Sequence, residues 1–212
     1  MANWDVSSIT SMASTFRNAS SFNVNIGSWD VSSVTITRTM FRNTDAFNQD
    51  IGSWDVSSLS NCNSMFRDNG GFQNGGNNNI NNWTFKNTGT INMRGMFRNS
   101  NFDRNIGSWN TGQVTEMRDM FRDNGNFDQD ISGWDFSGIS SADNLRNFFT
   151  NGELDDENYD ALLIRWSNQA SSMPNNIVVH MGDSEYDSNS AASARSTLIN
   201  TYGWSISDGG RK

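Results

Sequence analysis

Arginine recurs at one fixed point of a repeated pattern and is the residue type in this chain best placed to bind a ligand. In five units it directly follows a phenylalanine: Arg17, Arg42, Arg67, Arg98 and Arg122. If the units stack, these side chains form a column suited to a carboxylate-bearing partner, such as a sugar acid or an anionic protein patch, because arginine holds carboxylates through two parallel hydrogen bonds. The alternative is that Asp68 and Asp123 pair with these guanidinium groups, whose stems then only cover apolar surface.

Catalytic chemistry has much weaker support in the residue types. His180 is the only histidine, and Cys62, the only cysteine, occupies a position that other repeats give to apolar residues. One histidine and one cysteine cannot make a zinc cluster of the structural type. Acidic residues recur with the repeat and do not form one distinguished pair of the kind a glycosidase uses. We therefore expect no catalytic residues and no cofactor, and a carbohydrate-active enzyme is the least favoured interpretation.

The acidic residues have a structural explanation. Asp5, Asp30, Asp55 and Asp135 occupy equivalent positions in the repeat, two residues before a serine. A carboxylate at that point can accept hydrogen bonds from local backbone N–H groups. Calcium bound by Asp103, Asp128 and Asp130 is a second interpretation, but the chain has no Asp-x-Asp-x-Asp-Gly loop ending in glutamate. No metal site is predicted.

These residues belong to a repeat of about 25 residues. Its most regular marker is tryptophan, at Trp4, Trp29, Trp54, Trp83, Trp109 and Trp134. A period of this length predicts a solenoid, in which each unit contacts only its neighbours. For residues 1–150 we expect an α/β solenoid, a right-handed, leucine-rich-repeat-like stack of about six coils. Trp4 and Val6 flank Asp5 as in a short strand, and the spacing of Ile9, Met12 and Phe16 favours a short helix.

One repeat carries four extra residues between Phe72 and Ile80. Loops that interrupt a repeat are common binding points, although a tolerated insertion has the same sequence signature. The candidate binding residues in this loop are Gln73, Asn74, Gly75, Gly76, Asn77 and Asn78.

The two ends of the repeat region differ. Residues 151–212 contain a helical pattern through Tyr159 and Trp166, a β-rich run at 177–181, a second helical pattern closed by Gly203, and a short strand pattern. This order predicts a βαβ-like C-terminal cap. No comparable cover precedes the first repeat, so its apolar residues are a candidate docking end for a protein partner, a second copy or the protein's own particle, and an oligomer or assembly is expected. These residues are Trp4, Val6, Ile9 and Met12. The alternative is that the chain is a piece of a longer repeat protein.

Charge and hydropathy exclude several classes of partner. The formal net charge of −8 argues against nucleic acid. No apolar stretch is long enough to insert into a membrane, and the first residues show no export signal. We expect that a leader has been removed or that the protein leaves its cell by another route, such as release of virus particles on lysis.

Several strings in the chain resemble the repeats of BspA-like leucine-rich-repeat surface proteins. They include residues 48–58, residues 126–131 and the Met-Phe pairs at the end of each expected helix. The resemblance covers about residues 3–150, and residues 159–166 and 202–210 are similar to the tail that often follows such repeats. It implies adhesion or partner binding at a bacterial surface, without catalytic residues, and similar repeats occur in viral proteins.

From the residues and the resemblance together we expect a non-enzymatic, extracellular binding or adhesion module displayed on a bacterial cell or on a virion, as a capsid decoration, fibre or tail component. Its partner would be a protein or a host-surface glycan. The alternative is a purely structural assembly protein that docks through its N-terminal end.

Overall fold

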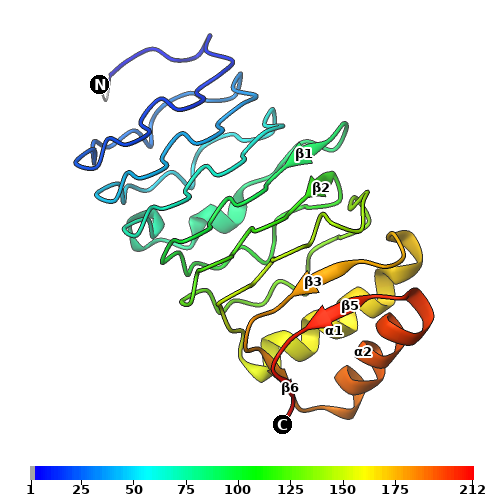
Figure 1. The fold of residues 1–212 in the computed structure, drawn as a ribbon. Coiled ribbons are helices and arrows are strands. Elements are labelled where there is room, and N and C mark those ends of the chain that lie inside the picture. Colours follow the sequence, from blue (N-terminus) through cyan, green and yellow to red (C-terminus); the bar gives the residue numbers. More distant parts are fainter. Residues whose placement is uncertain (1–2) are drawn as a thin grey trace.

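The computed structural model describes residues 3–212, and in it the chain winds through successive turns that stack along one direction (Figure 1). We call each turn a coil and number it by the phenylalanine that precedes its arginine. Coils 1 to 5 contain Phe16, Phe41, Phe66, Phe97 and Phe121. The two α-helices lie together at the C-terminal end of the stack, far from the N-terminus. The first two residues of the expected repeat region, 1–150, lie outside the described residues.

A narrow line of parallel β-bridges joins the first five coils. Three single bridges pair Ser11 with Ile36, Ile36 with Asn61, and Asn61 with Asn92. The line continues where strand β1 (Ile91–Asn92) pairs in parallel with β2 (Val114–Glu116). Each coil contributes only one to three residues to it. The coils are therefore held together mainly by other hydrogen bonds and by their core.

The short helix that the apolar spacing predicts in each repeat is not found in coils 1 to 5, and this expectation was wrong. In coil 1 the backbone N–H groups of Met12, Ser14 and Phe16 donate to carbonyls of coil 2. Those of Thr15 and Arg17 instead donate to the carbonyls three residues earlier. The segment is thus two consecutive tight turns joined to the next coil. Two such turns give the same four-residue apolar spacing as a helix.

The residue types at the turns explain why the chain does not continue as a helix. Two positions in each coil have positive φ, which a right-handed helix excludes. The first turn row comprises Ser14, Thr39, Ser64, Gly95, Asp119 and Asn147, and the second comprises Asn18, Asn43, Asp68, Asn99, Asp123 and Asn151. Glycine, asparagine and aspartate tolerate this conformation best. The arginine column lies directly before the second turn row.

Around the repeat tryptophans, Trp4 to Trp134, the described residues form no strand, in contrast to the expectation. The tryptophans act through their side chains. In four coils the indole Nε1 donates a hydrogen bond of 2.9–3.1 Å to an isoleucine carbonyl. The pairs are Trp54 with Ile26, Trp83 with Ile51, Trp109 with Ile80, and Trp134 with Ile106. Each acceptor lies one coil earlier. The recurring indole therefore fills the core and also satisfies a buried carbonyl of the preceding coil.

Phenylalanines form two further columns in the core. The rings of Phe16, Phe41, Phe66 and Phe97 stack at centroid distances of 5.6, 5.5 and 5.6 Å along the coils. A second ring lies beside each of them, as Phe47 does at 4.0 Å from Phe41. Because these rings are fully buried from Phe41 onward, the continuous apolar interior fixes the spacing of the coils.

The inserted loop folds against coil 3 as two short 3-10 helices, η1 (Asn74–Gly76) and η2 (Asn79–Asn82). The Asn74 amide is buried and its Oδ1 accepts a hydrogen bond of 2.8 Å from the backbone N–H of Ile51. Asp50 accepts hydrogen bonds from Asn77 and Asn79. The insertion is therefore tied to the repeat at both of its ends.

The C-terminal region contains both α-helices. Its elements are α1 (Asp156–Gln169), η3 (Ala170–Ser172), β3 (Val178–His180), β4 (Glu185–Tyr186), α2 (Asn189–Tyr202), β5 (Ser205–Ser207) and β6 (Gly210–Arg211). β3 pairs in parallel with β5, and β4 pairs in parallel with β6, so in each pair one strand precedes α2 in the sequence and the other follows it. Asp155 and Ser188 cap the two helices, and Gly203 ends α2 with φ +72°. The predicted helix and strand order is present.

This region closes the end of the stack. The backbone N–H of Phe149 donates to the carbonyl of His180 in β3, and that of Val178 donates to the carbonyl of Ala142. Trp166 of α1 packs on the ring of Phe136 at 5.8 Å. The last repeat residues therefore contact β3 and α1.

Candidate functional site

The five arginines named from the sequence lie in matching positions of coils 1 to 5. Each is preceded by a buried phenylalanine and followed by a residue of the second turn row. The buried ring fixes where the backbone lies, and the tight turn aims the next side chain away from the core. The repeat therefore positions one guanidinium group per coil along a single face.

A second set of arginines, which the sequence analysis missed, lies beside the first. Arg38 and Arg94 precede the first turn row in coils 2 and 4, and Arg118 does so in coil 5. Ala13 and Asn63 occupy this position in coils 1 and 3, so the column is interrupted and its signal is weaker. Arginine four residues before another arginine, in three of five repeats, was the available clue.

Arginines of coils 1 to 4, taken from both columns, line one open hollow of about 300 Å³, whereas Arg118 and Arg122 of coil 5 lie outside its lining. Its lining comprises Arg17, Arg38, Thr39, Arg42, Asn63, Ser64, Arg67, Arg94, Gly95, Arg98 and Asp119. Six of the 15 basic residues of a chain with net charge −8 thus face one place that has a single acidic side chain in its lining. We call it the arginine hollow. Thr39, Ser64 and Gly95, all of the first turn row, lie among its arginines.

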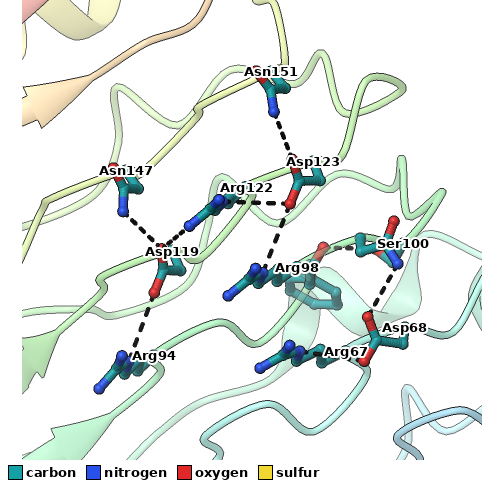
Figure 2. Close-up of polar contacts among 12 residues, drawn as sticks. Arg67, Asp68, Arg94, Arg98, Ser100, Asp119, Arg122, Asp123, Asn147 and Asn151 are labelled. Atoms are coloured by element: carbon teal, nitrogen blue, oxygen red, sulfur yellow. Dashed lines mark hydrogen bonds and ion pairs between the residues drawn. The ribbon is translucent and has the colours of Figure 1, made fainter.

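The arginine column is partly compensated by aspartates of the second turn row, as the alternative interpretation expected. Nε of Arg42 donates to Oδ2 of Asp68 at 3.1 Å, and Nε of Arg67 lies 3.2 Å from the same oxygen. Nε of Arg98 lies 3.7 Å from Asp123 Oδ2. Figure 2 shows the contacts of Arg67 with Asp68 and of Arg98 with Asp123.

The aspartates contact the inner nitrogen of the guanidinium groups. In the lining of the hollow, the ion-pair contact of each paired arginine is made by Nε. Among residues 3–212, no Nη atom of these six arginines donates a hydrogen bond to a protein group, and Arg17 and Arg38 make no ion pair. The Nη atoms form the end of the guanidinium fork that binds an oxyanion.

The crowding of positive charge affects the arginine at the middle of the hollow. Burial lowers the pKa of the Arg67 guanidinium, and the neighbouring charges of Arg98 and Arg42 lower it further, while Asp68 opposes them. An incoming anion would relieve this repulsion.

The positive charge ends at coil 5. Asp119, whose side chain is only 7% exposed, lies 3.7 Å from Arg94 and 3.5 Å from Arg122 and accepts a hydrogen bond from Asn147. Arg122 also lies 3.4 Å from Asp123 (Figure 2). Coils 1 to 4 therefore carry the excess of arginine, and coil 5 is close to neutral.

The inserted loop has both engaged and exposed residues, and Gln73 lines a separate open hollow. Asn74 is buried, and Gln73 accepts a hydrogen bond from the backbone of Asp103 and donates one to the carbonyl of Asn101. Gly75, Gly76, Asn77 and Asn78 are exposed. The structure does not bring this loop into the lining of the arginine hollow.

The candidate docking end combines exposed and buried residues. Trp4 is 58% exposed and Ile9 is 40% exposed, and these are the large hydrophobic side chains exposed among residues 3–212. Val6 and Met12 are buried in coil 1, so they support this surface from beneath. Together with Trp29 and their polar neighbours they line an open hollow of about 550 Å³.

The remaining candidates have structural partners. The backbone N–H groups of Ser7, Ser32, Ser57 and Ser137 donate to Asp5, Asp30, Asp55 and Asp135, which confirms the local explanation for these aspartates. The hydrogen bonds to Ser7 and Ser32 lower the pKa of Asp5 and Asp30. His180 Nδ1 lies 2.7 Å from Asn147 Oδ1. Burial raises the pKa of the Cys62 thiol to about 12.

The described residues contain neither a cluster suited to a metal ion nor a helix suited to a membrane span. No group of three or more histidine, cysteine, aspartate or glutamate side chains in residues 3–212 is arranged to hold a metal ion. In the same part of the chain no helix has the length and apolar character needed to cross a bilayer.

Stacked coils with matching side chains in each define a repeat protein, and the arginine hollow is a surface feature of that repeat. A family described as "Mycoplasma protein of unknown function, DUF285" matches residues 1–91 and 71–177. The chain belongs to this family, which is the family of BspA-like repeat proteins. Comparison with the curated proteins and with the solved structures gave no match.

Proposed function

We propose that this protein is a non-enzymatic binding module, displayed on the outer surface of a bacterial cell or a virion, that attaches to an anionic partner through the arginine hollow. We also propose that its stack is a right-handed, leucine-rich-repeat-like solenoid. The single observation that carries the function is the gathering of six arginines around one hollow in a chain of net charge −8. Membership of the BspA-like family supports surface display.

The arrangement favours binding over a role in stability alone. Partly exposed ion pairs contribute about 1 kcal/mol or less each, so pairing with Asp68 does not account for six arginines. Like charges placed close together oppose each other and need a compensating anion. Within the lining, the Nη atoms have no hydrogen-bonded protein partner, so a ligand can supply that anion.

A charge-matched pair of variants tests the proposal. Replacing Arg42, Arg67 and Arg98 with glutamine removes three charges from the hollow, and replacing Arg118, Arg146 and Arg211 removes three charges outside its lining. Fluorescent protein is then incubated with epithelial cells and with bacterial cells. We expect the first variant to lose binding and the second to keep it, with folding of both checked by circular dichroism. Equal binding by both variants, or no binding by the unmodified protein, would contradict the proposal.

The exposed apolar end favours a second function, assembly through coil 1. Trp4 and Ile9 present apolar surface beside a hollow, a combination typical of protein contacts. A double Trp4→Ser and Ile9→Ser variant should remain monomeric where the unmodified protein associates with itself at high concentration. A monomer at all concentrations in light scattering would exclude self-association through this end.

A further inference from the structure

We infer that the arginine hollow binds a linear acidic polysaccharide that lies along the stacking direction, with its anionic groups held by arginines of successive coils. This inference rests on the proposed function and adds the chemical class and orientation of the ligand.

The first argument is the spacing of the positive groups. Arg17, Arg42, Arg67 and Arg98 follow stacked phenylalanines that are 5.5–5.6 Å apart. The arginines therefore repeat once per coil over three intervals of about 5 Å, a length of about 15 Å. A compact anion such as phosphate occupies one such interval. A chain with an acidic group on each sugar, or on alternate sugars, can contact several coils at once.

The second argument is the room between the two arginine columns. Thr39, Ser64 and Gly95 lie among the arginines that line the hollow, and all three have short side chains or none. The hydroxyls of Thr39 and Ser64 are buried and hydrogen-bonded within the protein, so these residues contribute room and not ligand contacts. Asn63 accepts from Ser64 through Oδ1, and its Nδ2 donates to no protein group among residues 3–212, so it can donate to a sugar hydroxyl. The hollow thus combines oxyanion binders with space for a neutral polar backbone.

The third argument is what the lining does not contain. None of its eleven residues is aromatic or aliphatic. Protein interfaces depend on buried aromatic or apolar anchors, and proteins that bind single-stranded nucleic acid stack bases on aromatic rings. The lining offers neither, which favours a polysaccharide over an acidic peptide or a nucleic acid.

Asp119 limits where the ligand lies. Its carboxylate lines the hollow beside Arg94 and belongs to coil 5, where the arginines are balanced by acids. A polyanion would be repelled at this point. The bound segment is therefore confined to coils 1 to 4, and the ligand length that gives full affinity is that of four coils.

The test is direct titration of the full chain with size-defined oligosaccharides, heparin fragments for the sulfated source and hyaluronan fragments for the carboxylated source. The affinity should rise with oligosaccharide length until about 15 Å is reached and then level off. It should fall at least tenfold between about 50 and about 300 mM salt. Binding by either series supports the inference, and the stronger one identifies the acidic group.

Variants make the titration specific to the hollow. The combined Arg42→Gln, Arg67→Gln and Arg98→Gln variant should lose about thirtyfold in affinity, corresponding to about threefold for each charged contact. The matched Arg118→Gln, Arg146→Gln and Arg211→Gln variant should stay within about twofold. Asp119→Asn, which keeps a residue type that tolerates positive φ, should raise the affinity about threefold.

Poly-glutamate and oligo-thymidylate serve as competing probes. If either binds as tightly as the oligosaccharides, or if no oligosaccharide binds, the inference is overturned. The proposed function is tested separately by cell binding. If the hollow variant loses cell binding but no oligosaccharide binds, the ligand class is wrong and the binding face stands. If the hollow variant keeps cell binding, both are wrong.

Discussion

Oδ2 of Asp68 accepts a hydrogen bond of 3.1 Å from Nε of Arg42, one coil earlier in the stack. The same oxygen lies 3.2 Å from Nε of Arg67 in its own coil. One carboxylate thus holds two guanidinium groups in place while their Nη atoms have no hydrogen-bonded protein partner in the described chain. Asp68 therefore positions the arginines and at the same time reduces the positive charge that a ligand meets.

This dual role predicts opposite effects of Asp68→Asn on stability and binding. Asparagine tolerates the positive φ of this position and keeps an oxygen for the hydrogen bond from Asn99, so the substitution mainly removes charge. Unfolding in urea should show a loss of about 1 kcal/mol or less. Affinity for an anionic ligand should rise. Asp55→Asn, outside the hollow, is the control, and a fall in affinity for Asp68→Asn alone would contradict the account.

The tryptophan column predicts a graded loss of stability. Trp54→Phe keeps a ring in the core but removes the hydrogen bond to the Ile26 carbonyl, which should cost about 1 kcal/mol. Trp54→Ala should cost about 3 to 5 kcal/mol because a cavity is left. Urea midpoints measure both.

Trp4→Phe is the matched control, because Trp4 is largely exposed and should be insensitive to the change. If Trp4→Phe and Trp54→Phe destabilised the protein equally, the inter-coil hydrogen bond would have no special role.

The turn rows predict that backbone conformation decides which residues are tolerated at Gly95. Its φ is +58°, and a Cβ there would meet Ser64 Oγ at 3.4 Å, so space is adequate. Gly95→Asn should therefore be nearly neutral, whereas Gly95→Val should cost about 1 to 2 kcal/mol. Thermal unfolding distinguishes them. Equal stability of the two variants would refute the conformational explanation.

Cys62 predicts a change of stability at high pH. Burial raises the pKa of its thiol from 9.0 to about 12, so the folded state keeps a proton that the unfolded state loses. The contribution is complete below about pH 9 and is lost as the pH rises toward about 12. In urea unfolding, Cys62→Val should show a shallower loss of stability across this range than the unmodified protein.

A thiol reagent offers an independent check on Cys62. At pH 8 the folded protein should react far more slowly than the unfolded chain, because the thiolate is the reactive species. Rapid labelling of the folded protein would show that the thiol is accessible and ionised.

Residue types and spacing predicted some features of the structure correctly and others wrongly. The recurrence of tryptophan and phenylalanine marked the residues that occupy equivalent places in neighbouring coils. The short helix was wrong because two consecutive turns place apolar residues four apart, as a helix does. The distinguishing signal was the small polar or glycine residues at four-residue intervals, of which Ser14 and Asn18 are the first pair. The handedness of the stack stays a prediction.

The candidate site was predictable only in part, for a similar reason. The uninterrupted arginine column was visible because it repeats in five units. The second column was missed because Ala13 and Asn63 interrupt it. That the two columns share one hollow depends on how the turns fold, which the residue pattern did not determine.

The most direct test of the arginine hollow is residue-by-residue modification with phenylglyoxal, read by mass spectrometry with and without a saturating acidic oligosaccharide. Arg17, Arg38 and Arg94 are the most open arginines of the lining and should react in the free protein. The account predicts that the ligand protects these three while Arg146 and Arg211, outside the hollow, react as before. Protection of Arg146 and Arg211 to the same degree, or no protection of the three, would contradict it.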